Sequence, residues 1–319
     1  MFKFWRFTPV ALVLALAVGS FAISYAQESA PKVQLPADTQ ALIRFNFRAM
    51  IDSPLAKKMG EKEIIKALDF DVEILAEMGF DPLKDIDSIT IAAPGGGDME
   101  KCLIILTGKF KADKLVAKAN EDAKNNECVK IHKAGDKTIF ESKDFFPDQQ
   151  VPMFMMIASN STILASTQKE HLEKALANSG SKLANKDFSA LIEKLDPDLA
   201  ISMVAVSSAF PSKAIPEPYK AIIEGIDSII GGIGIDEDVT LKINVFTKDE
   251  DSSKKLKETL DQGMAQALGF LGLMAAQEKE LTPVLEFVKS MKTSSKEKMM
   301  SLEGKLPSKM IEDAILGSK

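Results

Sequence analysis

The chain has few of the residues that commonly build aromatic binding platforms or metal sites: one tryptophan, two tyrosines, two histidines and two cysteines among 319 residues. Trp5 and Tyr25 both lie near the N-terminus, so beyond them the chain keeps only Tyr219 of these two ring types. This scarcity argues against carbohydrate or single-stranded nucleic-acid binding on large aromatic platforms, although phenylalanine can still stack on bases. Two cysteines with this spacing match no zinc-binding pattern.

Arginine is also scarce, because beyond the first 26 residues only Arg44 and Arg48 remain. The formal net charge is −6, and it becomes −8 when Lys3 and Arg6 are removed with the N-terminal segment. A protein that binds nucleic acid needs a basic face to displace the counterions of the phosphates. The acidic balance therefore makes nucleic acid an unexpected partner.

The N-terminus has the pattern of an export signal. Lys3 and Arg6 precede the apolar run "VALVLALAV", and Ser24 and Ala26 supply the small residues that a signal peptidase recognises. We expect a signal peptide over residues 1–26, cleaved after Ala26. The alternative is an uncleaved anchor, since the apolar run is near the lower limit of about 17 residues for a membrane span.

Beyond this segment, no window is apolar for long enough to cross a bilayer. The best candidate, "MAQALGFLGLMAA", is too short and contains a glutamine and two glycines. The polar, proline-containing residues 27–37 are expected to form a flexible leader. We therefore expect a soluble mature protein that is exported, either periplasmic or secreted, and has no transmembrane span after signal cleavage.

The segment "ALIRFNFR" alternates between apolar and polar residues, which predicts a half-buried strand. On such a strand Arg44, Asn46 and Arg48 share one face. The two guanidinium groups, at i and i+4 with the asparagine between them, could jointly bind a carboxylate or a phosphate. The simpler interpretation is a solvated or helix-covered sheet face on which both arginines pair with acids.

The triple glycine in "AAPGGGDMEKCLIIL" is the most motif-like feature of the chain. A Walker loop needs Gly-x-x-x-x-Gly-Lys-Ser/Thr directly before a helix. Here a β-branched and aliphatic segment follows, Lys101 is misplaced, and no serine or threonine completes the motif. The glycines are therefore predicted to connect two strands, after a helix from Ser53 to Met78 that Gly79 and Pro82 end.

A longer similarity links two parts of the chain. Residues 86–107 align with residues 226–247 without a gap, with "IDSI" identical at the start and threonine at the end. A strand and a helix precede each stretch, and a helix follows it. We interpret this as a duplicated β-α-β-β-α unit, the order of a ferredoxin-like split βαβ motif. The predicted fold is α+β, with two related units, 38–196 and 197–319, whose antiparallel-rich sheets are packed by helices.

This arrangement bears on the two cysteines. The strands with Cys102 and Cys128 would flank the first strand of the unit, which places them about 9 to 10 Å apart. A disulfide requires Cα atoms within roughly 7 Å. A Cys102–Cys128 disulfide is therefore not expected.

No pattern predicts a catalytic residue, a metal ligand or a cofactor. His132 and His171 lie in no triad motif, and both are expected at the surface. The methionines of "MFMM" and "KMM" could bind copper(I), but core packing is the simpler interpretation. The acidic clusters "DEDV" and "KDEDSS" lack calcium-loop spacing. Thr167 and Glu170 form a capping-box pattern before the helix "KEHLEKALAN".

The largest apolar surface belongs to a long helical region that starts near Ser252. Leucines and a methionine recur there at helical spacing, and residues 269–276 are apolar nearly all round. Such a helix is either buried between layers or faces a ligand, a partner or lipid. The simplest expectation is burial between the two related units.

Two motifs, "GFDPLKDIDSI" and "GKFKADKL", resemble those of a group of uncharacterised exported bacterial α+β proteins. The matching positions are Gly79, Asp81, Pro82, Asp85, Ile86, Ser88 and Ile89 in the first motif, and Gly108, Lys109, Phe110, Lys114 and Leu115 in the second. The resemblance extends over the mature chain. It implies membership and fold but no activity and no site residue.

The expected function is a non-enzymatic binding or interaction role in the periplasm or cell envelope. The partner would be an unknown protein or a small apolar or anionic ligand, held by apolar contacts of sheet and long helix. One alternative is a hydrolase-like envelope enzyme whose site residues are dispersed in the sequence. Another is a purely structural or assembly protein.

Overall fold

The computed structural model describes residues 33–62, 64, 81–97, 101–125, 127–135, 137–143, 151–176, 183–210, 217–278 and 281–316. The expected signal peptide, most of the leader, and the expected helix beyond residue 64 lie outside these residues. Contacts divide the chain into two compact units. Unit 1 is Met1–Thr39, Glu61–Ala93 and Asp98–Ala184, and unit 2 is Gln40–Gly60, Pro94–Gly97 and Asn185–Lys319.

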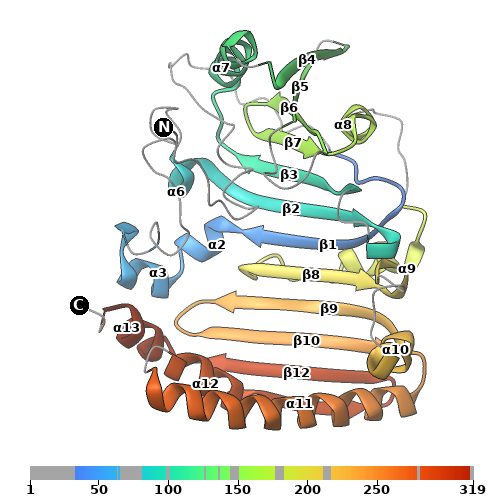
Figure 1. The fold of residues 1–319 in the computed structure, drawn as a ribbon, viewed down its shortest axis with the longest axis vertical. Coiled ribbons are helices and arrows are strands. Elements are labelled where there is room, and N and C mark those ends of the chain that lie inside the picture. Colours follow the sequence, from blue (N-terminus) through green and yellow to red (C-terminus); the bar gives the residue numbers. More distant parts are fainter. Residues whose placement is uncertain are drawn as a thin grey trace. The chain divides into compact units, whose positions relative to one another are not determined.

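The described part of unit 1 combines an antiparallel sheet with helices. In chain order its elements are α6 (Pro82–Asp85), β2 (Ile86–Pro94), β3 (Leu103–Gly108), α7 (Ala112–Asn125), β4 (Val129–Ala134), β5 (Lys137–Ser142), β6 (Met153–Ser159), β7 (Thr162–Ser166) and α8 (Lys169–Ala175). The strand order is β2-β3-β7-β6-β5-β4, and every neighbouring pair is antiparallel (Figure 1).

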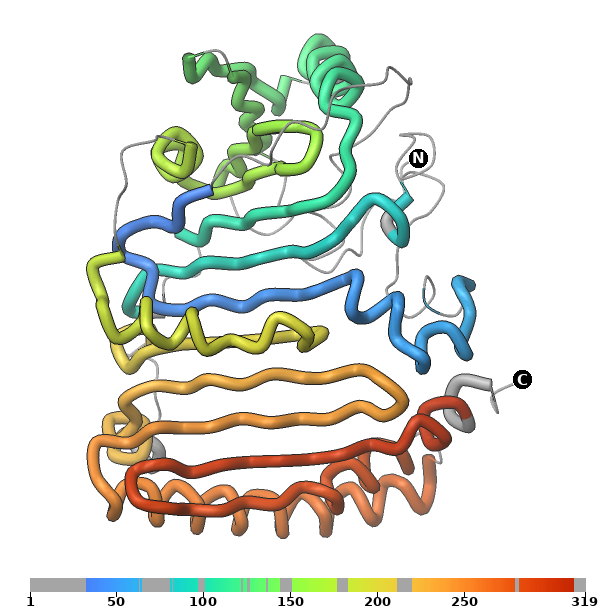
Figure 2. The backbone as a smooth tube through the Cα atoms, turned by 180° about the vertical axis from the view of Figure 1, so that it is seen from behind, coloured from blue at the N-terminus to red at the C-terminus, as the bar shows by residue number. Residues whose placement is uncertain are grey.

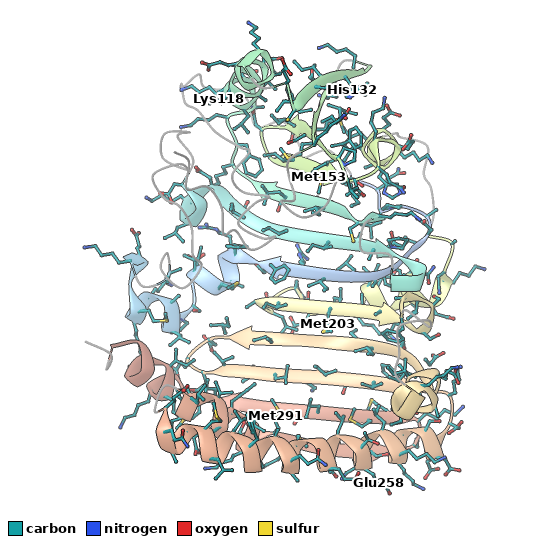
Figure 3. The ribbon with its side chains drawn as sticks, in the orientation of Figure 1. Lys118, His132, Met153, Met203, Glu258 and Met291 are labelled. Atoms are coloured by element: carbon teal, nitrogen blue, oxygen red, sulfur yellow. The ribbon has the colours of Figure 1, made fainter. Side chains whose placement is uncertain are left out.

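The core of unit 1 lies between this sheet and α8. Leu103, Leu164 and Leu172 are fully buried in one cluster with Ile139 and Met156. The methionines of "MFMM", among them Met153 (Figure 3), are buried as well, so the core-packing interpretation of these residues is confirmed. Met156 belongs to the cluster beneath α8, and an unbranched thioether side chain suits the irregular spaces of such a core.

Unit 2 is also an antiparallel sheet with helices. Its elements are β1 (Thr39–Asn46), α2 (Phe47–Ile51), α3 (Pro54–Met59), the 3-10 turn η1 (Gly95–Gly97), α9 (Lys186–Ile192), β8 (Ile201–Val206), η3 (Ser207–Ala209), α10 (Glu217–Glu224), β9 (Ile226–Ile235), β10 (Val239–Thr247), α11 (Glu250–Gln277), α12 (Thr282–Ser290), β11 (Lys292–Lys296), β12 (Met299–Leu306) and α13 (Ser308–Leu316). The strands follow the order β11-β12-β10-β9-β8-β1, which can be traced in Figure 2.

The α+β class with antiparallel sheets is confirmed, but the ferredoxin-like units are not. A split βαβ motif needs two parallel strands joined by a crossover helix. Here β8 pairs antiparallel with β9, and β9 pairs antiparallel with β10. The connection through α10 therefore brings the chain back antiparallel on the strand next to β8. In a split βαβ motif the two connected strands would instead be parallel, with another strand between them.

The two aligned stretches do form equivalent hairpins, β2–β3 and β9–β10, but their registers differ. Ser88 lies opposite Thr107, whereas the aligned Ser228 lies opposite Phe246. The gapless alignment would require Ser228 to face Thr247. A one-residue offset moves side chains to the other face of a sheet, so strand pairing does not confirm the duplication.

The triple glycine connects the paired strands β2 and β3, as predicted from the missing Walker residues. Gly96 has φ +78°, a left-handed conformation that glycine adopts without steric cost. A Cβ at Gly95 would lie 3.0 Å from the carbonyl oxygen of Ser208, so glycine also permits a close approach here. Chain geometry explains both positions.

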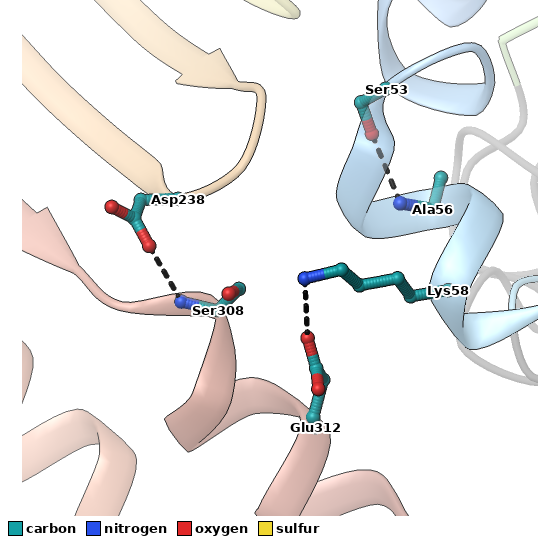
Figure 4. Close-up of polar contacts among 6 residues, drawn as sticks. All are labelled: Ser53, Ala56, Lys58, Asp238, Ser308 and Glu312. Atoms are coloured by element: carbon teal, nitrogen blue, oxygen red, sulfur yellow. Dashed lines mark hydrogen bonds and ion pairs between the residues drawn. The ribbon is translucent and has the colours of Figure 1, made fainter.

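Polar contacts fix the short helices of unit 2 (Figure 4). Ser53 caps α3, because its Oγ accepts a hydrogen bond from the backbone N–H of Ala56 at 3.1 Å. Lys58 of α3 forms a 3.4 Å ion pair with Glu312 of α13. Asp238 accepts a hydrogen bond from the backbone N–H of Ser308 at 2.9 Å, at the start of α13.

In the part of the chain that the structure describes, no helix has both the length and the hydropathy that a membrane span requires.

Candidate functional site

The structure keeps Arg44 and Asn46 of the predicted anion site on one strand but places Arg48 on the helix that follows. β1 ends at Asn46 and α2 begins at Phe47, so Arg48 lies on a helix and does not share a strand face with Arg44. Asn46 caps α2 by accepting a hydrogen bond from the N–H of Ala49 at 3.0 Å, and its Nδ2 donates to the carbonyl of Pro197 at 2.9 Å. The predicted strand geometry is therefore wrong.

The placement of the cysteines also differs from the expectation. Cys102 directly precedes β3 and Cys128 directly precedes β4, and β7, β6 and β5 lie between these two strands. They do not flank a common first strand. Four strand spacings amount to about 19 Å, well beyond the reach of a disulfide. Cys102 is buried and Cys128 is half-buried.

His132 is less exposed than the sequence suggests, because it pairs with a buried carboxylate. Its Nε2 lies 2.6 Å from Oε2 of Glu141, and the imidazole ring lies beside the ring of Phe154 with centroids 6.0 Å apart. Glu141 is buried, so the pair satisfies a carboxylate that would otherwise lose its solvation. This contact links β4 to β5 and explains why a histidine lies there.

A second histidine lies near a serine, a pair that the sequence did not indicate. Oγ of Ser166 lies 3.3 Å from Nδ1 of His171, and burial lowers the pKa of His171, opposed by the nearby Asp38 carboxylate. Ser166 is 1% exposed, and its Oγ accepts the backbone N–H of Gln168 at 3.1 Å. A nucleophile must reach its substrate, so this serine serves the start of α8.

The hydrogen bond from the N–H of Gln168 to Ser166 takes the place of the predicted capping box. α8 has Gln168 as its N-cap residue, without a side-chain capping bond. Ser166, two residues before the N-cap, supplies a hydroxyl to the backbone N–H of Gln168, whereas Oγ1 of Thr167 is buried with no hydrogen-bond partner. The Thr167–Glu170 pattern therefore does not form the cap.

A further candidate site is an apolar pocket of about 520 Å³ in unit 2. It is bordered by α10, by α11 from Leu256 to Ala267, and by the end of α12 with the residue that follows, Met291. Figure 1 shows these three helices. The lining residues are Ile222, Ile223, Leu256, Thr259, Leu260, Gly263, Met264, Ala267, Val288 and Met291.

Helix α11 positions this pocket. Asp249 caps its start by accepting the N–H of Ser252 at 2.7 Å, and this hydrogen bond lowers the pKa of Asp249. Acids in the first turn complement the helix dipole. From Leu256 to Ala267 each pocket residue of α11 has another three or four residues away from it, so these residues form one stripe.

The pocket is elongated along α11. Leu256 and Ala267 are eleven residues apart, which is about 16 Å along a helix. α10 contacts α11, and α12, which returns along α11 after the connection at residues 278–281, contacts it as well. The α10 residues therefore lie toward one end of the stripe and those at the end of α12 toward the other.

The lining offers a ligand almost no hydrogen bonds. Of the ten lining residues, Thr259 has a polar side chain, and its Oγ1 already donates to the carbonyl of Lys255 at 2.9 Å. Gly263 adds open space, since a Cβ there would meet nothing within 4 Å. The pocket therefore suits a hydrocarbon surface and disfavours a group that must hydrogen-bond.

Packing beneath the helices is incomplete. Four residues of the local core are buried: Ile226, Val245, Leu256 and Met300. Their apolar neighbours, Ile222 and Leu260 among them, are only partly buried, and α12 has no buried residue. Apolar surface that stays wet forgoes roughly 25 cal/mol per Å² of burial. A ligand that covered it would recover part of that free energy.

The second half of α11 corrects another expectation. Phe270 is 64% exposed and Leu273 is 72% exposed, so this end of the helix is not buried between two units as expected. Val284 of α12 is exposed as well. The remaining interpretations, a ligand, a partner or lipid, apply to this face.

Comparisons with known proteins identify no relative from which a site could be transferred. No protein-family model matches the chain, and no curated protein matches it, in line with its resemblance to an uncharacterised group. A solved structure titled "Structure of crystal form I of TP0453" is similar to this fold with a TM-score of 0.42 and 8% sequence identity. The match covers 92% of this chain and 99% of that one.

Proposed function

We propose that this protein is an exported, non-enzymatic binding protein that holds a small apolar ligand in the pocket between α10, α11 and α12. The observation that carries the proposal is the pocket itself, whose volume of about 520 Å³ falls within the range typical of small-molecule sites. Its lining is aliphatic and thioether, so burial of hydrocarbon supplies the binding free energy.

The export part of the proposal is supported by the N-terminal sequence. A positive segment with Lys3 and Arg6, an apolar run and small residues at positions 24 and 26 form the order that a signal peptidase recognises. A periplasmic or secreted location follows from this pattern. Sequencing the N-terminus of the protein recovered from the producing cell checks it, and a chain that retains residues 1–26 would contradict it.

An anionic ligand held by Arg44 and Arg48 receives less support than an apolar one. The pocket lining includes neither Arg44 nor Arg48, and Asn46 is engaged in capping α2. We therefore propose an apolar ligand in which any charged group stays in water. Burying a charge without a partner would cost more than the pocket's apolar contacts return.

An enzymatic function is the second candidate, and the Ser166–His171 contact is the observation that favours it. Its geometry argues against hydrolysis, because Ser166 is 1% exposed and its Oγ accepts the N–H of Gln168. Substitution of Ser166 by alanine should leave any ester hydrolysis by the purified protein unchanged. A loss of activity with an intact fold would make the enzymatic reading the better one.

The binding proposal is tested by filling the pocket from within. In the Gly263→Leu variant the new side chain has open space at its Cβ and projects into the lining, so the unliganded fold is preserved. We expect binding of a fluorescent apolar probe to weaken by about tenfold or more, since roughly one aliphatic group of the ligand is displaced.

Gly272→Leu is the matched control. Gly272 lies on the same helix, a Cβ there also meets nothing within 4 Å, and the residue does not line the pocket. Both substitutions raise helix propensity equally, so a difference in probe binding reports on the pocket alone. Equal binding by both variants and the unaltered protein would overturn the proposal.

A further inference from the structure

Phe270 continues the pocket stripe on α11 toward the end of the helix. It follows Gly263 by seven residues and Ala267 by three, and both spacings keep residues on one side of an α-helix. Gly263 and Ala267 line the pocket, whereas Phe270 is 64% exposed. The apolar line therefore leaves the pocket and continues into solvent.

α12 repeats this pattern on the opposite side of the groove. Val288 and Met291 line the pocket, and Val284 precedes Val288 by four residues, so Val284 and Val288 lie on one side of the helix, ahead of Met291 at its C-cap. Val284 is 46% exposed. Since α11 and α12 contact each other, Phe270 and Val284 extend the two walls of the pocket toward the turn that joins the helices.

The extension is apolar over its whole length on α11. Residues 262–277 of this helix, "QGMAQALGFLGLMAAQ", contain no charged side chain. Phe270 lies fourteen residues beyond Leu256, so the stripe is about 21 Å long along the helix. A compact ring system would fill the pocket and leave this outer part wet, whereas a long chain would cover both.

We infer that the site takes one extended hydrocarbon chain, such as the tail of a single-chain amphiphile, lying along α11 from the α10 end to Phe270 and Val284. The polar head of this ligand remains in water, because the lining has one hydroxyl and that hydroxyl is engaged within the helix. The inference rests on the proposed function and names the ligand class for the same pocket.

The test measures binding of straight-chain carboxylates to the mature protein by isothermal titration, below their micelle concentrations. Each added methylene that finds apolar contact should tighten binding by about fourfold, so affinity should rise steadily from octanoate to dodecanoate and further to hexadecanoate. Adamantane carboxylate, a compact cage with the carbon number of undecanoate, should bind at least about tenfold more weakly than undecanoate, because it cannot follow the stripe.

Two variants locate the outer part of the chain. Phe270→Ser should weaken hexadecanoate binding by about tenfold and leave octanoate binding unchanged, since only the longer chain reaches that residue. Leu273→Ser is the control, because Leu273 is 72% exposed on the same helix but lies six residues from Ala267 and ten from Gly263, spacings that turn it away from both pocket residues. It should leave both affinities unchanged.

The outcomes separate this inference from the proposed function. If adamantane carboxylate binds as tightly as undecanoate, or if Phe270→Ser has no effect on hexadecanoate, the extended-chain inference is wrong. Should Gly263→Leu still abolish probe binding in that case, the apolar pocket stands as the binding site. If none of the carboxylates and no apolar probe binds, both proposals fall.

Discussion

Asn46 illustrates how much a single side chain can change a predicted site. The alternation of residues 41–48 correctly predicts a strand, but it cannot reveal where the strand ends. Asparagine is a preferred N-cap residue, and here its side chain accepts the N–H of Ala49 and starts a helix. That competing preference moves Arg48 off the strand, so the strand-face argument for pairing it with Arg44 no longer applies.

Asp238 is a residue whose charge state should affect stability. It forms a 2.7 Å ion pair with Lys305 and accepts the N–H of Ser308 (Figure 4), and these hydrogen bonds, that of Lys305 first, lower its pKa. A pKa that is lower in the folded state stabilises the fold above the unfolded value of about 3.8. This contribution is lost as pH falls through the folded pKa.

We therefore expect Asp238→Asn to lower the free energy of unfolding at pH 7, with a smaller difference from the unaltered protein at pH 3. Urea denaturation of both proteins at the two pH values measures this difference. Asp198→Asn, at an exposed position, is the control and should change stability by no more than about 0.5 kcal/mol. A penalty at Asp238 that does not depend on pH would contradict the ion-pair explanation.

Among the elements, α11 was predicted well because its apolar period is long and its acidic start is clear. The hairpins β2–β3 and β9–β10 were also predicted, since each has two aliphatic runs around a break. Which strands lie side by side could not be predicted. Pairing of β8 with β9 or β10 depends on the path of the connection, and local composition does not encode that path.

Replacing glycines by alanine should change the free energy of unfolding in a direction that depends on the space around each glycine. Gly272 has open space around a Cβ, so Gly272→Ala should raise the free energy of unfolding by about 1 kcal/mol through helix propensity. Gly231→Ala should lower it, because a Cβ there would lie 2.2 Å from the carbonyl oxygen of Lys242 in β10. Chemical denaturation checks both, and destabilisation by Gly272→Ala would mean that this helix face is occupied.

At the scale of the whole molecule, ligand binding should be visible as a stability change. A ligand present at about one hundred times its Kd stabilises the folded state by about 2.7 kcal/mol. For a unit of this size, that corresponds to a rise in Tm of roughly 5 to 10 °C. We expect dodecanoate to raise the Tm of the unaltered protein in calorimetry.

The Gly263→Leu variant should show no such rise, while Gly272→Leu should behave as the unaltered protein does. A similar rise in both variants would place the ligand elsewhere. The sequence could not identify this pocket, because its lining comes from three helices and the apolar residues of any one of them are indistinguishable from core. The sequence feature that pointed to this region is a helix that is apolar nearly all round and contains several glycines.

The two units alternate along the chain, because unit 2 is built from segments that lie between and after those of unit 1. The sequence predicts a boundary near residue 196, but β1 (Thr39–Asn46) belongs to unit 2 and pairs with β8 (Ile201–Val206). No single cut can therefore separate the two units intact. A fragment that begins at Asn185 would keep β8 but lose β1, leaving a row of open backbone donors and acceptors that invites strand pairing between molecules. During synthesis, β1 must likewise wait for more than half of the chain to be made before its partner strand exists.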